Sequence, residues 1–469
     1  MISPGTEFIE ILSKKLVEYI MEKKRGEWKH LEVHLSDATL PGEGEHKIMD
    51  FIRANKGKLG NTAIYGLDSD LIFLTLINCE EKCVLVRESV QFGGKFKKTR
   101  DATEKDYTYL SIDDLKRCIL RVLSPLVSMS ELEGIEIFND YGFKVPRKIK
   151  TRFYTGSKRD NQRLIMDYAF FSFLLGNDFI PNLPSLIIKE NGLDMVIQAY
   201  KIISWYLGDY LVRADGVSIN QRFFRLMLNE LKEIEEDFLI YSAEQREIRV
   251  AKFKKRLNFT KDRLKRELDD FECVEHKCRD VIRVHERGWC NRYYFEHFNI
   301  PHRHATEFEK RINPICYRYL EGMKWSLLYY QGKHHNWTWY YNYHAAPSIT
   351  DLAKSLDTFD FDECDFKRST PVDPFVQLMS ILPPESSKLL PRYIGELMTK
   401  RDSKLHYMYP LKIELNMLNK RWLWECKPLL PDIDIESIIR IVDHIFYQKY
   451  RFDPKLVKRN SIGSTRKFI

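Results

Sequence analysis

Five acidic side chains lie in three short, turn-like segments of this chain, each beside an apolar run. PGEGEHK holds Glu43 and Glu45, IYGLDSDLIFL holds Asp68 and Asp70, and FLLGNDFIPNLP holds Asp178. Like charges raise one another's pKa, so a fold that gathers these carboxylates has to offset their repulsion. A hard divalent cation does so, and Mg²⁺ is held in proteins by carboxylates and water.

Such a cluster indicates chemistry on phosphate esters. Two metal ions bound together can contact both the attacking and the leaving oxygen of a phosphodiester. For a single carboxylate in a turn, helix capping is the better explanation, and Glu45 and Asp70 each stand where a helix is expected to begin. Five carboxylates in these contexts favour a metal centre with two Mg²⁺ ions, for which Mn²⁺ could substitute.

Amino-acid composition indicates a large globular protein but does not identify its binding partner. A length of 469 residues is enough for two or three domains, and 44% hydrophobic residues support a large core. A net charge of +8 fits a polyanionic partner and fits an ordinary basic protein equally well.

Cysteine usage and hydropathy bear on where the protein acts. Nine scattered cysteines without a CxxC pair argue against structural zinc and against a disulfide framework, which favours a reducing compartment. No signal peptide opens the chain, and no apolar stretch approaches membrane-spanning length. We therefore expect a cytoplasmic or nuclear protein without a membrane partner.

Alternating strand and helix patterns predict an α/β fold with a mostly parallel sheet. Strands are expected within residues 30–36, 61–67 and 82–89, and an amphipathic helix over 6–24. The apolar face of this helix comprises Phe8, Ile11, Leu12, Leu16, Tyr19 and Ile20. Active sites of such sheets form at the carboxyl ends of strands, where the first two acidic turns would both lie.

Charge patterning divides the rest of the chain. Residues 229–287 interleave Glu and Lys at helical spacing, which is typical of a solvated helical connector. The connector separates a first unit, residues 1–228, from a second lobe, residues 288–469. The lobe ends in a basic tail, KRNSIGSTRKFI, that we expect to be disordered.

The second lobe also contains an aromatic segment. Trp325 and Tyr329 are four residues apart, which favours core packing on one helix face. Trp337 and Trp339 would face opposite ways in an extended chain, so one could pack while the other stacks on a base. Stacking contributes roughly 1–3 kcal/mol per base. Both tryptophans are RNA-binding candidates, although packing explains each one alone equally well.

Seven segments between residue 2 and about residue 430 resemble, in the same order, the Xrn-type 5′→3′ exoribonucleases. They are ISPGTEFIEIL, LPGEGEHKIMDFIR, AIYGLDSDLIFLTL, LLGNDFIPNLPSL, ERGWCNRYYFEHF, YLEGMKWSLLYYQGKHHNWTWYYNYHAAPSITDL and DPFVQLMSILPPESSKLLP. The resemblance implies a PIN-like 5′-nuclease core plus a largely helical second lobe. It also implies Mg²⁺-dependent shortening of single-stranded RNA, with all five carboxylates as metal ligands and a base-stacking Trp in the second lobe.

The chain departs from the family pattern at its start. Family members carry an additional N-terminal region with two more catalytic aspartates and a pocket for the 5′-monophosphate, so we expect the core to be N-terminally incomplete. The chain could be half of a split enzyme that needs a separate polypeptide, or a truncated product. It could also be a noncatalytic RNA-binding or scaffold member, or a DNA flap-type 5′ nuclease.

Overall fold

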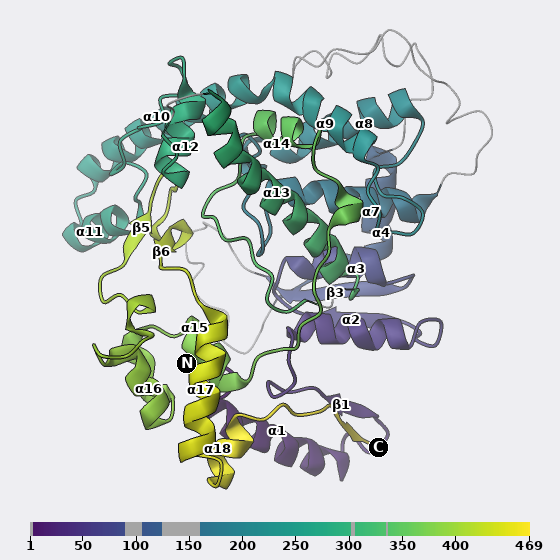
Figure 1. Ribbon diagram of the computed structural model, residues 1–469. Coiled ribbons are helices and arrows are strands. Elements are labelled where there is room, and N and C mark those ends of the chain that lie inside the picture. Colours follow the sequence, from purple (N-terminus) through teal and green to yellow (C-terminus); the bar gives the residue numbers. More distant parts are fainter. Residues whose placement is uncertain (1–2, 90–105, 124–159, 302–304, 334–335) are drawn as a thin grey trace.

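The computed structural model describes residues 3–89, 106–123, 160–301, 305–333 and 336–469, and helices dominate these parts of the chain (Figure 1). The helices are α1 (Glu7–Lys24), α2 (Gly44–Ala54), α3 (Asp70–Asn78), α4 (Ile112–Val122), α7 (Asn161–Ser172), α8 (Gly192–Leu207), α9 (Gln221–Glu233), α10 (Glu235–Phe259), α11 (Arg263–Glu272), α12 (Trp289–Phe298), α13 (Ala305–Tyr330), α14 (Ile349–Ser355), α15 (Pro374–Ile381), α16 (Arg392–Thr399), α17 (Ile435–Lys449) and α18 (Pro454–Arg459). The strands are β1 (Val33–Leu35), β2 (Thr62–Tyr65), β3 (Cys83–Glu88), β4 (Tyr107–Ser111), β5 (Glu414–Asn416), β6 (Lys427–Leu429) and β7 (Arg466–Phe468). None of the described helices combines the length and the apolar character that crossing a membrane requires.

Helix α1 matches the helix expected over residues 6–24, but its apolar face is mostly exposed. Ile20 is buried, together with Ile9 and Ser13. The remaining predicted face is between 38% and 55% exposed and comprises Phe8, Ile11, Leu12, Leu16 and Tyr19. Contiguous apolar exposure of this kind is typical of a surface that binds another polypeptide.

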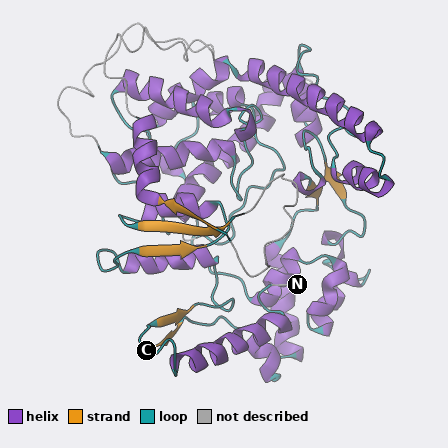
Figure 2. Ribbon diagram, turned by 180° about the vertical axis from the view of Figure 1, so that it is seen from behind, coloured by secondary structure: helices purple, strands orange, loops and turns teal. Residues whose placement is uncertain are grey.

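The second acidic turn follows strand β2 of a three-stranded sheet in the order β2-β3-β4 (Figure 2). Strands β2 and β3 are parallel, from Thr62 opposite Cys83 to Tyr65 opposite Val86, whereas β3 and β4 are antiparallel. Helices α3 and α4 pack against β3. The described residues therefore form a mixed α/β structure with one parallel and three antiparallel strand pairs, and a mostly parallel sheet is not confirmed.

Strand β1 pairs with the end of the chain rather than with β2. Val33 lies opposite Phe468 in antiparallel register, and Lys467 Nζ is 2.9 Å from Glu32 Oε1. The prediction of a disordered basic tail is therefore wrong. Local composition indicated disorder, but the tail is ordered by partners that are distant in sequence, including the carbonyl of Thr39, which accepts the amide of Gly463 at 3.0 Å.

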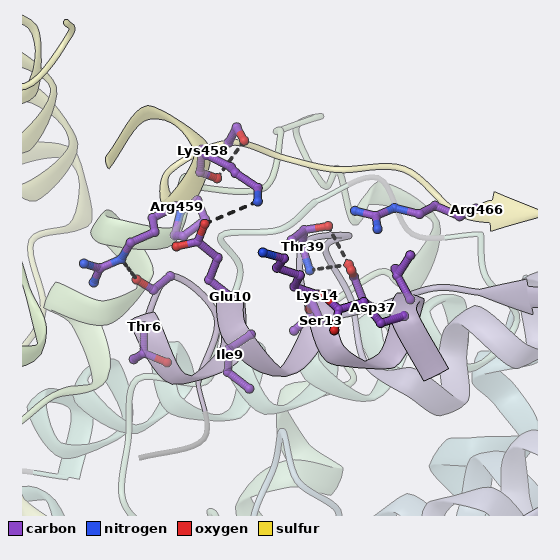
Figure 3. Close-up of a pocket in the computed structure, with 16 residues that line it drawn as sticks. Thr6, Ile9, Glu10, Ser13, Lys14, Asp37, Thr39, Lys458, Arg459 and Arg466 are labelled. Atoms are coloured by element: carbon purple, nitrogen blue, oxygen red, sulfur yellow. Dashed lines mark hydrogen bonds and ion pairs between the residues drawn. The ribbon is translucent and has the colours of Figure 1, made fainter. Parts of the chain in front are cut away.

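Figure 3 shows a cavity of about 270 Å³ where the C-terminal segment meets α1. Lys458 Nζ lies 3.3 Å from Glu10 Oε1, and Arg459 Nε donates to the carbonyl of Gly5 at 3.0 Å. None of the five predicted site carboxylates lines this cavity. These contacts tie the two ends of the chain together away from the acidic turns.

Two clusters of buried apolar side chains form the core. The first extends in sequence from Met49 to Phe361 and draws on α3, α7, α8, α9 and α13. The second extends from Phe375 to Val442 and joins α15, α16 and α17. The sequence predicts three parts, residues 1–228, 229–287 and 288–469, and the first cluster includes buried side chains from all of them. The division into these parts stays a prediction.

A tight turn after α7 places the third acidic segment. The helix continues as a short 3₁₀ helix, Phe173–Leu175, and ends at Gly176, which has a φ of +89°. A β-carbon at Gly176 would lie 2.7 Å from the backbone nitrogen of Asn182. Only glycine fits both this φ and this close approach, so Gly176 fixes the direction of the chain two residues before Asp178.

We expect Gly176→Ala to lower the free energy of unfolding by about 2–4 kcal/mol, because positive-φ strain and backbone overlap both act against the folded state. Urea denaturation measures this change. Gly26→Ala is the control, since no atom lies within 4 Å of its added β-carbon and its φ is not positive. Equal effects of the two substitutions would contradict the assigned role of Gly176.

Candidate active site

The start of α2 presents the first two predicted carboxylates. Glu43 is the N-cap residue, with φ −70° and ψ 149°, but its side chain makes no capping hydrogen bond. Glu45 lies in the first helical turn, where the helix dipole favours negative charge. The Glu43 carboxylate is therefore displayed beside the helix rather than used in building it.

The turn between β2 and α3 presents the second pair. Asp68 Oδ1 accepts the backbone amide of Asp70 at 3.2 Å, which shapes the turn. Asp70 is the first residue of α3, and its Oδ2 accepts a hydrogen bond from the hydroxyl of Tyr330 at 2.6 Å. Each carboxylate thus keeps one oxygen atom outside these hydrogen bonds.

The loop after Gly176 presents Asp178, whose side chain is exposed. Its neighbour Asn177 holds the loop, because Asn177 Oδ1 accepts the amides of Phe179 and Ile180, each at 2.9 Å. Asn177 Nδ2 also donates to Ser326 Oγ on α13 at 3.2 Å. The position of Asp178 therefore depends on both α7 and α13.

The electrostatics show that the three segments converge. Burial raises the pKa of Glu43, and the nearby charges of Asp178 and Asp70 raise it further. Burial, followed by the charges of the other four carboxylates, raises the pKa of Glu45 to about 7. Burial also raises the pKa of Asp70, although the hydrogen bond from Tyr330 opposes this rise. All five predicted side chains lie close enough to repel one another.

The donor set fits a hard divalent cation in its chemistry, because carboxylates that repel one another in a partly buried site are stabilised by added positive charge. Among the described residues, no three His, Cys, Asp or Glu side chains are arranged closely enough to hold an ion by themselves. An ion at this place would therefore use water or additional ligands together with the carboxylates.

Sequence reasoning missed two side chains at this site. Tyr329 and Tyr330 end α13, and the Tyr329 hydroxyl donates to Glu43 as the Tyr330 hydroxyl does to Asp70. The helical spacing of Trp325 and Tyr329 predicted core packing, and the Tyr329 ring does stack on Trp325 with centroids 4.8 Å apart. Nothing in the local sequence indicates the partner of either hydroxyl.

His46 also joins the edge of the cluster. Its Nε2 lies 3.7 Å from Glu43 Oε2, and its ring centroid is 3.9 Å from that of Tyr329. The side chain is buried, in agreement with a structural role for this histidine.

The structure separates the two candidate tryptophans. Trp339 is half-buried, stacks on Trp325 with centroids 5.3 Å apart, and has the guanidinium of Arg318 4.7 Å from its ring centroid. Trp337 is 41% exposed. Its Cη2 would lie 3.7 Å from a β-carbon at Gly42, so the indole borders the PGEGE turn. Trp339 therefore packs, and Trp337 is the tryptophan that solvent reaches beside the acidic site.

Two known protein families match this chain. Residues 1–89 match the family described as "XRN 5'-3' exonuclease N-terminus". Residues 158–271 and 240–469 match the family described as "Xrn1 helical domain", and these two matches cover well over half of the chain. The chain belongs to the Xrn family.

Curated relatives of this Xrn chain are named 5'-3' exoribonucleases. It is 29% identical over 531 residues to 5'-3' exoribonuclease 2 of Arabidopsis thaliana, covering 94% of this chain and 51% of the relative. It is 27% identical over 571 residues to 5'-3' exoribonuclease 1 of Schizosaccharomyces pombe, covering 100% and 40%. With 5'-3' exoribonuclease 1 of Homo sapiens it shares 29% identity over 487 residues, covering 94% and 26%. The chain thus spans about half or less of the length of these relatives.

The two family matches meet at the carboxylate cluster. Four of the five carboxylates fall within residues 1–89, whereas Asp178, Tyr329 and Tyr330 fall within the helical-domain matches. The candidate active site of this Xrn chain is therefore built by both regions.

We expect Glu45→Gln to stabilise the metal-free protein at pH 8. Because the folded state raises the pKa of Glu45 from 4.5 to about 7, the stability of the metal-free protein falls as pH rises through this interval and stays low above it. Glu45 is partly exposed, so after allowance for solvent screening we expect a gain of about 1 kcal/mol.

Thermal melting at pH 5 and pH 8 measures this effect. The gain should disappear at pH 5, and millimolar Mg²⁺ should narrow the difference at pH 8 by stabilising the wild type. Glu22→Gln, at an exposed position on α1, is the control and should change neither curve. A pH-independent effect of Glu45→Gln would contradict the electrostatic account.

Proposed function

We propose that this chain acts in the Mg²⁺-dependent hydrolysis of single-stranded RNA from its 5′ end. The observation that carries the proposal is the proximity of five carboxylates from three separate segments. It is supported by the pKa values of Glu43, Glu45 and Asp70, which burial raises first and the charges of neighbouring carboxylates raise further. Membership of the Xrn family and the names of the relatives supply the class of substrate.

In this proposal, Glu43, Glu45, Asp68, Asp70 and Asp178 would hold up to two Mg²⁺ ions, with Mn²⁺ as a substitute. Such ions supply stabilisation of the attacking and leaving oxygens of a phosphodiester. The carboxylates themselves repel RNA phosphate, so RNA binding at this place depends on the occupancy of the site. The nine scattered cysteines support a reducing compartment, the cytoplasm or the nucleus, as the place of action.

Trp337 is the residue that we propose to contact RNA. It lies beside the PGEGE turn, so a base stacked on its indole would be next to the carboxylates. Stacking on an aromatic face tolerates any base, as a nuclease without sequence preference requires. The packed Trp339 would support the segment that carries Trp337.

A second candidate is that the chain works only with a separate polypeptide. Two observations favour it. The described carboxylates do not close around an ion by themselves, and α1 exposes an apolar face that includes Phe8, Ile11 and Leu12. A partner that covers this face could supply further ligands. Without such a partner, the chain would serve as an RNA-binding member of the family that does not cut.

Asp68→Ala/Asp70→Ala should abolish Mg²⁺-dependent shortening of 5′-monophosphate RNA, because it removes two of the five proposed ligands. Gel analysis of end-labelled RNA measures the loss. Asp432→Ala removes an exposed carboxylate elsewhere and should have no effect. If wild type and double variant are equally inactive, rescue of the wild type alone by a polypeptide encoded upstream would support the second candidate. Equal activity of both would contradict the proposed function.

Trp337→Ala should weaken binding of single-stranded RNA by about 5- to 150-fold, which corresponds to the roughly 1–3 kcal/mol that one stacked base contributes. Fluorescence anisotropy with labelled RNA in Ca²⁺ measures affinity without turnover. Trp424→Ala is the matched control, because Trp424 is 77% exposed elsewhere on the surface. Equal losses for the two variants would argue against a specific role of Trp337.

A further inference from the structure

The last turn of α13 brings two neighbouring tyrosines to the carboxylate cluster. Tyr330 Oη donates a hydrogen bond to Asp70 Oδ2 at 2.6 Å, and the Tyr329 hydroxyl donates to Glu43. We propose that Tyr329 and Tyr330 are positioning residues whose hydroxyls hold Glu43 and Asp70 in the orientation that binds a divalent cation. This inference rests on the proposed metal centre and gives α13 a role beyond its place in the core.

The Tyr330 ring is held on several sides, so its hydroxyl has little freedom. The side chain is 1% exposed. Its centroid lies 5.4 Å from that of Phe173 and 6.1 Å from that of His46. A hydroxyl that donates to an ionised carboxylate makes a short, strong hydrogen bond, as the 2.6 Å distance indicates. The bond engages Oδ2 of Asp70 and leaves Oδ1 for another partner.

The Tyr329 ring is enclosed in a similar way. It stacks on Trp325 with an interplanar angle of 13°, and its centroid lies 4.9 Å from that of Phe179. His46 covers it from α2 at 3.9 Å. Because Phe179 follows Asp178 directly, the ring also contacts the loop that presents the third acidic segment. Tyr329 thus connects two of the three segments that form the cluster.

The end of α13 is fixed to the helices that carry the carboxylates. Asn78 Nδ2, at the end of α3, donates to the carbonyl of Tyr330 at 2.9 Å. Asn78 Oδ1 in turn accepts Arg53 Nη1 of α2 at 2.7 Å. These bonds set the position of the α13 backbone relative to both α2 and α3. The two hydroxyls therefore reach their carboxylates from a fixed support.

Helical geometry explains how adjacent residues serve different carboxylates. Consecutive side chains on an α-helix diverge by about 100°, so one tyrosine can face α2 while the next faces α3. Each hydroxyl restricts the rotation of a carboxylate and places a partial positive charge beside it. Hydrogen-bond partners of metal ligands typically change metal affinity by about 10–100-fold when they are removed.

Mn²⁺ binding to the full chain, measured by electron paramagnetic resonance without RNA, tests the inference. We expect Tyr330→Phe, which removes one oxygen and keeps the ring, to weaken Mn²⁺ binding at least tenfold. Tyr319→Phe is the matched control on the same helix, because Tyr319 is equally buried and donates to the carbonyl of Pro181 at 3.0 Å. Tyr319→Phe should lower the melting temperature without changing Mn²⁺ affinity.

A double-mutant cycle distinguishes positioning from general destabilisation. If Tyr330 acts through Asp70, Tyr330→Phe should weaken Mn²⁺ binding no further in an Asp70→Asn background. Unchanged affinity of Tyr330→Phe, or equal losses with and without Asp70, would overturn the inference, as would a wild type that binds no Mn²⁺. Normal Mn²⁺ results without RNA cleavage would leave the inference standing and count against the proposed function alone.

Discussion

Repulsion among five carboxylates has to be offset before the acidic turns of this chain can lie together. Burial, followed by the charges of the other four carboxylates, raises the pKa of Glu45 to about 7, so nearby protein donors do not compensate this carboxylate. Backbone and tyrosine donors serve Asp68, Asp70 and Glu43. Negative charge that the protein's own donors do not compensate favours the binding of protons or cations. Binding of either at these carboxylates should therefore stabilise the folded protein.

Both matched family regions contribute to the candidate site. Helix α13 lies in the main apolar core, and its last turn contacts α2 and α3 through Asn78. The loop of Asp178 is joined to the same helix through Ser326. The helical region therefore supplies residues to the same site as the N-terminal region.

Much of the candidate site could be predicted from sequence, because its carboxylates stand in local patterns. Asp68 and Asp70 follow an apolar strand, and Glu43 precedes an amphipathic helix, so a short window of sequence reveals each of them. The tyrosine hydroxyls could not be predicted in this way. Helical spacing correctly indicated that the Tyr329 ring packs on Trp325, but the hydroxyl partner belongs to a distant segment.

The same limit applies to the prediction of the fold. Basic composition suggested a disordered tail, whereas β7 is ordered by β1 at the other end of the chain. The alternation of strands and helices suggested a mostly parallel sheet, whereas only β2 and β3 pair in this way among the described strands. Strand partners are residues distant in sequence, and a pattern within a short window of sequence does not identify them.

Anomalous diffraction from crystals of the chain grown with Mn²⁺ would show whether the five carboxylates share bound metal. We expect a manganese peak bounded by the side chains of Glu43, Glu45, Asp68, Asp70 and Asp178. A crystal structure in which these side chains point to unconnected places, or in which manganese binds only elsewhere, would contradict it.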